Sequence, residues 1–125
     1  MRISCFGARV LSEEQEKKVL MIWTELRKDR EWVTYVHGGS KGVQELILKY
    51  EKEIGGADTI LFAPWHFVDK GLVFSPKLML KRNIQILDNS DLVLLFDLEE
   101  GNRLAWTEVY CEEHGIDVIL IKETT

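Results

Sequence analysis

The sequence predicts an α/β protein with a single Rossmann-like, doubly wound domain: a five-stranded, mainly parallel sheet with helices on both faces. Short apolar runs alternate along the chain with segments of helical periodicity, which favours βαβ units and a parallel sheet. These runs are continuously apolar, as expected for strands buried on both faces. The 125 residues suit one domain, 1–125, with right-handed crossovers between its strands.

The five predicted strands are rich in β-branched and aromatic residues and end at glycine, proline or polar residues. They span residues 3–6, 32–36, 59–62, 92–96 and 116–121. The segment from Trp65 to Phe74 is predicted to be an irregular loop, and loops of that length are often functional.

Four helices are predicted between the strands from their end signals. A capping box of Ser12 and Gln15 begins the first. Ser40 is expected to cap the second, which ends at a glycine pair, 55–56. Pro76 takes the first position of the third helix. The fourth is predicted over about 103–114.

Composition limits the classes of partner. The formal net charge of −5 argues against a general affinity for nucleic-acid backbone or an anionic membrane, so neither partner is expected. Cys5 and Cys111 lie far apart and are expected to be free thiols in a reducing compartment. No apolar run approaches the length of a membrane span, and the first is too short for a signal peptide. The sequence therefore predicts a cytoplasmic protein.

Ligands of doubly wound sheets bind beyond the carboxyl ends of the strands. In this chain the residues there are 7–9, 37–42, 64–66 and 97–102. Gly38 and Gly39 follow a strand and precede a helix, where glycine allows a close backbone approach and the helix offers free N–H groups to an anion. Ser40 and Lys41 add a hydroxyl and a charge. A tight turn with an exposed lysine is the alternative, since the spacing matches neither common phosphate-binding glycine motif.

The segment 35–42, Tyr-Val-His-Gly-Gly-Ser-Lys-Gly, resembles the HGG-x-x-G segment of the SLOG superfamily, and its YspA-type branch most of all. Gly7-Ala8-Arg9 is similar to the Gly-Ser-Arg of that branch, and Pro64-Trp65 to its Pro-x-x-Trp-like segment. Lys81-Arg82-Asn83, ahead of Ser90-Asp91-Leu92-Val93, is similar to its RN helix and the strand that follows.

The segment 106–118 resembles the ending that the superfamily shares with nucleoside deoxyribosyltransferases and LOG phosphoribohydrolases. Tyr110 replaces a glycine of that ending and Asp117 a proline. The resemblance implies a nucleotide-derived ligand and, in enzymatic members, an arginine and a glutamate that cleave or transfer N-glycosidic bonds. Arg82 and Glu108 are the matching positions, and a carboxylate suits an oxocarbenium-like transition state.

Two functions stay open. The favoured one is a module that binds a nucleotide or nucleotide-derived ligand, such as a signalling nucleotide, and senses, carries or sequesters it. The alternative is a small N-glycosidase, deoxyribosyltransferase or phosphoribohydrolase that uses Glu108 and Arg82. Binding is favoured because Glu99-Glu100-Gly101 replaces the glycine-rich phosphate turn of the enzymes. Residues expected to contact the ligand are Gly7, Arg9, Gly38, Gly39, Ser40, Lys41, Pro64, Trp65, Asn83, Asp97, Gly101 and Asn102.

Some of these residues have assigned roles. Trp65 could stack on a base, whereas Asp97 could accept ribose hydroxyls or simply form a turn. Trp23 and Trp32 are expected in packed positions. The histidines and cysteines lack a ligand spacing, so we predict no metal site and no cofactor. A homo-oligomer is expected, because four tryptophans are hard to bury in one small core and the resemblance points the same way.

Overall fold

The computed structural model describes residues 1–62, 65–68, 71–74, 76–98 and 104–122, with the side chains of 65–79 left out. Its main sheet has five strands in the order β3-β2-β1-β6-β7, and every neighbouring pair is parallel. The strands are β1 (Arg2–Gly7), β2 (Thr34–His37), β3 (Asp58–Leu61), β6 (Leu92–Asp97) and β7 (Asp117–Lys122). The predicted α/β Rossmann-like fold is confirmed.

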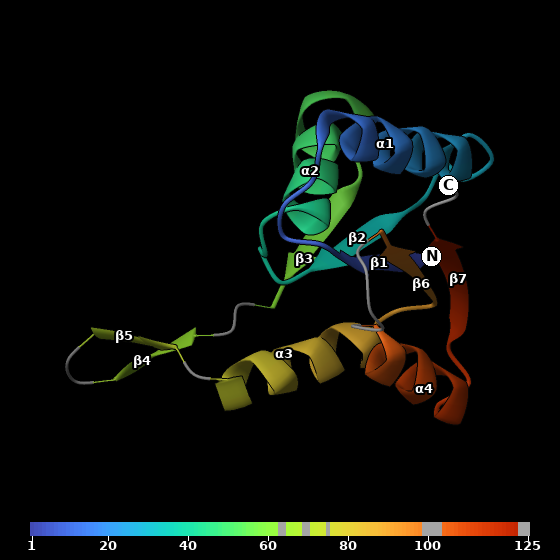
Figure 1. Ribbon diagram of the computed structural model, residues 1–125. Helices are drawn as coiled ribbons and strands as arrows, with labels where there is room; N and C mark the ends of the chain where they lie inside the picture. Colours follow the sequence, from blue (N-terminus) through green and yellow to red (C-terminus); the bar gives the residue numbers. More distant parts are fainter. Residues whose placement is uncertain (63–64, 69–70, 75, 99–103, 123–125) are drawn as a thin grey trace.

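Helices cover both faces of this sheet (Figure 1). One face carries α1 (Glu13–Arg27) and α2 (Val43–Tyr50), and the other carries α3 (Pro76–Asp88) and α4 (Ala105–Glu113). Successive strand residues point to opposite faces, so each strand contributes to two apolar layers. The layer under α1 and α2 includes Ile3, Cys5, Trp23, Tyr35 and Ile47, and the layer under α3 and α4 includes Phe6, Val36, Ile86, Leu87 and Cys111.

The two helices on the first face begin differently. At α1 the predicted capping box is present: the Ser12 hydroxyl accepts from the Gln15 N–H at 3.1 Å, and Gln15 Oε1 accepts from the Ser12 N–H at 2.9 Å. At α2 the expected Ser40 cap is wrong. That helix begins after Gly42, whose φ of 81° is a glycine conformation, and no side chain caps it. The Ser40 hydroxyl accepts a hydrogen bond from Arg82 instead.

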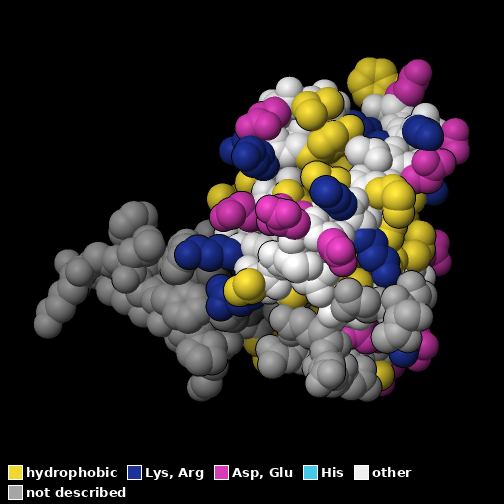
Figure 2. Space-filling view, turned by 45° about the horizontal axis from the view of Figure 1, so that its top comes forward, with side chains coloured by type: hydrophobic (Ala, Val, Ile, Leu, Met, Phe, Trp, Pro, Cys, Tyr) yellow, Lys and Arg dark blue, Asp and Glu magenta, His cyan; other side chains and the backbone are white. Residues whose placement is uncertain are grey.

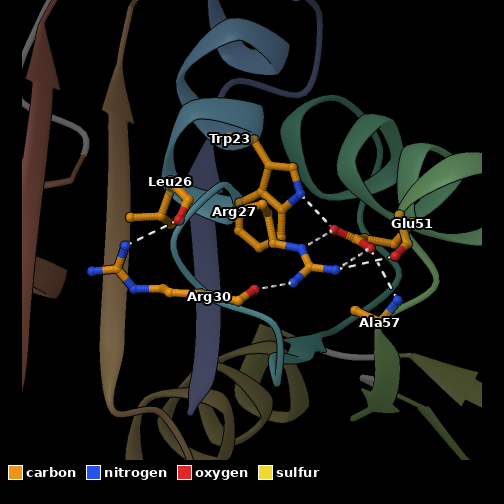
Figure 3. A network of polar contacts seen from close by, with 7 residues as sticks. Trp23, Leu26, Arg27, Arg30, Glu51 and Ala57 are labelled. Atoms are coloured by element: carbon orange, nitrogen blue, oxygen red, sulfur yellow. Dashed lines mark hydrogen bonds and ion pairs between the residues drawn. The ribbon is translucent and has the colours of Figure 1, made fainter.

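A buried ionic network holds the end of α2 (Figure 3). There the chain continues as a π-helical turn, η1 (Glu51–Gly55). The Glu51 carboxylate is 1% exposed and accepts from Trp23 Nε1 and Arg27 Nε, both at 2.8 Å, and from the Ala57 N–H at 3.1 Å. A Cβ on Gly55 would overlap that carboxylate. The network therefore ties α1 to the connection that leads into β3.

The segment predicted to be an irregular loop is instead a hairpin. β4 (Trp65–Val68) and β5 (Gly71–Phe74) pair antiparallel in a separate two-stranded sheet. The hairpin extends away from the main sheet near the N-terminal end of α3 (Figure 1). Aromatic and β-branched residues flank its two-residue connection, which glycine follows, so the sequence did carry a hairpin signal that the loop interpretation overlooked.

The two tryptophans expected in packed positions have different environments. Trp23, on α1, is fully buried, as predicted. Trp32 is 85% exposed, because it precedes β2 and lies outside both apolar layers. Among the residues described, no helix is both long enough and apolar enough to cross a membrane.

Candidate functional site

The strand order places a reversal point between β1 and β6. From β1 the chain moves outward to β2 and β3, then returns to β6 on the other side of β1 and continues to β7. In open sheets of this kind, ligands bind beyond the carboxyl ends of the strands at such a reversal. Gly7 and Asp97 are the last residues of β1 and β6, so these two residues of the predicted site lie at the reversal point.

The glycine loop after β2 is held from beneath by α2. Gln44 is buried in the first turn of that helix, and its Oε1 accepts from the Gly38 N–H at 2.9 Å. The Tyr35 hydroxyl in turn donates to the Gln44 carbonyl at 3.1 Å. Gly39 has a φ of 72°, which few other residues adopt. The contacts through Gln44 hold the backbone of the loop at Gly38 against α2.

Arg82 reaches this loop from α3 on the opposite side of the sheet. Its Nη1 donates to the Gly38 carbonyl at 3.1 Å and to the Ser40 hydroxyl at 2.9 Å. Its Nε donates to Asn83 Oδ1 at 3.0 Å. A Cβ on Gly38 would overlap the guanidinium, so glycine makes room for the side chain. The structure thus brings together four residues that the sequence proposed as a site: Gly38, Ser40, Arg82 and Asn83.

The charge of Arg82 has no acidic partner within the described part of the chain. The residue is only 3% exposed, and its three acceptors are a carbonyl, a hydroxyl and an amide oxygen. Its Nη2 makes no hydrogen bond with a described residue. Burial and, to a smaller extent, the positive charge of Arg9 lower the pKa of Arg82 from its usual value. The guanidinium groups of Arg82 and Arg9 therefore lie near each other. We call the place where they meet the loop of Gly38 and Ser40 the corner.

His37 lies at the end of β2 in the same corner. Its ring stacks on Tyr35, with ring centroids 5.2 Å apart, and its Nδ1 accepts from the Gly39 N–H at 3.1 Å. Burial, followed by the positive charges of Lys52 and Arg82, lowers the pKa of His37 below its usual value. The ring is therefore neutral at pH 7, with its proton on Nε2.

Two hollows open beside this corner and share Arg9. The first hollow has a volume of about 270 Å³ and is lined by Gly7, Ala8, Arg9, Val10, Phe96, Asp97, Leu98 and Leu104. The second hollow has a volume of about 320 Å³ and is lined by Arg9, Leu11, Glu16, Lys41, Gly42, Glu45, Leu46 and Lys49. Four residues of the predicted set therefore line these hollows: Gly7, Arg9, Asp97 and Lys41. Gly39 belongs to the glycine loop that follows β2.

Of the other predicted site residues, only Glu108 has a described side chain. Pro64, Gly101 and Asn102 lie outside the described residues, and Trp65 begins β4 with its side chain not described. Glu108 is half-buried on α4. No hydrogen bond or ion pair between described residues joins it to Arg82.

Sequence reasoning missed two groups at this corner. Gln44 supports the glycine loop, and its position in the first turn after the loop was an available signal. Glu16, Glu45 and Lys49 line the second hollow together, although they come from two helices. Their proximity depends on how α1 packs beside α2, and short-range spacing carries no signal of that packing.

Comparisons with known proteins locate the fold. No protein-family model matches the sequence, and no curated protein matches it. The structure resembles DNA processing protein A from Helicobacter pylori, solved to explain its single-stranded DNA binding mode, with a TM-score of 0.76 and 15% identity over 99% of this chain. It also resembles DNA processing protein A (DprA) from Streptococcus pneumoniae, with a TM-score of 0.77 and 18% identity over 98% of this chain. The chain spans 66% and 50% of the lengths of these two proteins.

These neighbours contradict two expectations drawn from the sequence. A small nucleotide-derived ligand was expected, for binding or for N-glycosidic chemistry, and a nucleic-acid partner was not. Both neighbours are DNA processing proteins, and one is described by its binding of single-stranded DNA. The expectation of no nucleic-acid partner rested on the net charge of −5, which is a sum over the whole chain. Such a sum does not show that Arg9, Lys41 and Arg82 lie around one corner.

Proposed function

We propose that this chain binds single-stranded DNA, with one backbone phosphate at the corner formed by Arg82, Arg9, Ser40 and Lys41. The observation that carries the proposal is the buried guanidinium of Arg82, which has neutral acceptors only and an Nη2 without a partner among the described residues. A buried charge is costly unless it is paired, and phosphate is an anion that arginine binds well.

Chain topology and the neighbours support the choice of ligand. The corner lies at the reversal point of the sheet, where ligands of this architecture gather. A DNA processing protein of the same fold is described by its single-stranded DNA binding mode. Lys41 and Arg9 are exposed and would attract the strand, while Arg82 is held rigidly for one phosphate.

The remaining predicted contacts are part of the same proposal. Gly7 and Asp97 line the first hollow, where a base or sugar next to the bound phosphate would lie and Asp97 would accept a hydrogen bond. Asn83 orients Arg82 through its Nε. Stacking of a base on Trp65 is proposed from its residue type alone, and contacts of Gly39, Pro64, Gly101, Asn102 and Glu108 with the strand stay predictions.

A binding titration tests this function. Fluorescence anisotropy with a labelled oligonucleotide of about twelve nucleotides should show binding that weakens as salt rises, because phosphate contacts release counterions. Replacing Arg82 with Ala should weaken binding by about 2–5 kcal/mol, the usual loss for one partner of a buried charge pair. The exposed Lys17 on α1 provides the control, since Lys17→Ala should change binding little.

Competitors separate the ligand classes in the same assay. Unlabelled single-stranded DNA should displace the probe, whereas duplex DNA, RNA of the same sequence and mononucleotides should do so less well. Displacement by a mononucleotide at a concentration equal to that of the oligonucleotide would overturn the proposal. So would an affinity that Arg82→Ala leaves unchanged in a folded protein.

Two finer expectations from the sequence are also proposals. Placement in the YspA-type branch of the SLOG superfamily is supported by Gly7-Ala8-Arg9, the loop 37–42 and Arg82-Asn83. Self-association is supported by large apolar side chains on α4 and the edge strand β7: Trp106, Val109, Ile119 and Leu120, which are 47%, 49%, 41% and 39% exposed. Light scattering that gives the mass of one chain at micromolar concentration would contradict self-association.

A further inference from the structure

The second hollow has a composition that a phosphate site does not explain. It lies next to the proposed phosphate corner, because Arg9 lines both hollows. Three cations line it, Arg9, Lys41 and Lys49. Two carboxylates, Glu16 and Glu45, line it as well. The face carried by α1 and α2 shows the same mixture, with Lys and Arg side chains close to Asp and Glu side chains (Figure 2).

The carboxylates exclude a second phosphate and suit another part of a nucleotide. Glu16 and Glu45 would repel a phosphate in this hollow, whereas a carboxylate accepts hydrogen bonds from an exocyclic amino group of a base. Leu11 and Leu46 are half-buried and line the same hollow, so they offer an apolar surface to a base ring. The three cations would then neutralise the phosphates on either side of that base.

We propose that the second hollow binds a nucleobase with an exocyclic amino group, as in cytosine or adenine, next to the phosphate held by Arg82 and Arg9. This inference rests on the proposed function and adds base preference to it. Thymine has no exocyclic amino group, and the two carbonyl oxygens that flank its N3–H would be repelled by the carboxylates of Glu16 and Glu45. The strand would therefore be bound with a preference for cytosine over thymine.

Helix electrostatics offer a competing reason for the two carboxylates. Glu16 and Glu45 both lie in the first turns of their helices, where a negative side chain interacts favourably with the helix dipole. Glu13 provides a matched control, because it lies in the same first turn of α1 but lines neither hollow. A role in the helix alone predicts equal behaviour of the Glu13 and Glu16 variants, and base recognition predicts different behaviour.

The test compares oligo-dC with oligo-dT, each of about twelve nucleotides, by fluorescence anisotropy at one salt concentration. The wild-type chain should bind oligo-dC about tenfold more tightly, within the usual range for one good base contact. The double variant Glu16→Gln/Glu45→Gln should bind oligo-dT more tightly than the wild type, since two negative charges are lost. In this double variant, the ratio of the affinities for oligo-dC and oligo-dT should approach one. Glu13→Gln should keep the wild-type ratio.

The outcomes separate this inference from the proposed function. Equal affinity of the wild type for oligo-dC and oligo-dT would overturn the base preference and leave the phosphate corner standing. A preference that survives in the double variant would overturn the role of Glu16 and Glu45. Absence of binding to either oligonucleotide would overturn the proposed function and this inference together. Lys49→Ala should weaken the binding of both oligonucleotides to the same extent, about threefold. The Lys17→Ala control should leave both affinities unchanged.

Discussion

Two arginines in this chain, the half-buried Arg27 and the buried Arg82, have opposite surroundings. Arg27, on α1, pairs with the Glu51 carboxylate at 2.8 Å and also donates to the carbonyls of Arg30 and Gly55 at 2.8 and 3.2 Å. Arg82, on α3, has neutral acceptors and a neighbouring guanidinium, that of Arg9. The first charge is neutralised within the fold, and the second is not neutralised by any described residue.

We interpret the Arg27 charge as structural and the Arg82 charge as that of the proposed binding site. A cation with a carboxylate partner and a full set of hydrogen bonds is already neutralised. Such a cation connects elements of the fold and has no free charge or donor to offer a ligand. A buried cation that is held rigidly by neutral groups keeps its field available at the surface nearby. We therefore expect variants of the Arg27 network to change stability and variants around Arg82 to change binding.

The largest expected effect is on the structural side. Glu51→Gln should lower the free energy of unfolding by about 3–5 kcal/mol, because it leaves Arg27 without its counterion and turns an amide donor toward other donors. Urea unfolding followed by circular dichroism measures this loss. Glu53 lies in the same π-helical turn and is exposed, so Glu53→Gln should change stability little. Below its melting temperature, folded Glu51→Gln protein should bind single-stranded DNA as the wild type does.

A second variant reverses that pattern at the binding corner. Gly38→Ala should weaken DNA binding nearly as much as Arg82→Ala, because the new Cβ would displace the guanidinium. The cost in stability should be about 1–3 kcal/mol, typical of overpacking. Gly38 does not have a positive φ, so the alanine backbone itself is not strained.

Gly56→Ala is the control for this variant. Gly56 has a φ of 73° but nothing lies within 4 Å of the added Cβ, so the change strains the backbone without crowding a side chain. Gly56→Ala should lower stability and leave DNA affinity unchanged. Loss of DNA affinity in both variants would mean that general destabilisation, rather than displacement of Arg82, explains the Gly38 result.

Much of this arrangement could be predicted from the sequence, because its signals are local. Apolar runs, the Ser12 capping box and the Pro76 start located most elements, and the rule for strand ends placed the glycine loop and Arg9 at one edge. These inferences need only the period of each element and the direction of the crossovers. Arg82 joined the predicted site through its match to the RN helix of the SLOG superfamily, and the structure shows it in contact with the Gly38 loop.

The parts that could not be predicted depend on non-local packing. Ser40 precedes a helix and was expected to cap it, but Arg82, 42 residues further along the chain, takes its hydroxyl. The carboxylate of Glu51 is buried and pairs with Arg27, 24 residues away, and nothing near Glu51 in sequence indicates this. Net charge failed for the same reason, since a sum over the chain carries no information on where Arg9, Lys41 and Arg82 meet.

The smallest expected effect is a pH dependence of stability at the binding corner. The folded state lowers the pKa of His37 through burial and the nearby charges of Lys52 and Arg82, so folding favours the neutral ring. In the unfolded chain the ring has a pKa of about 6.5. The stability contributed by this ring is therefore fully present above about pH 6.5. It is lost as the pH falls from there through the lower pKa of the folded state. Urea unfolding at pH 7.5 and 5.5 should show the wild type losing more stability than His37→Gln, whose side chain does not titrate. Equal losses in the two proteins would mean that other groups carry the pH dependence.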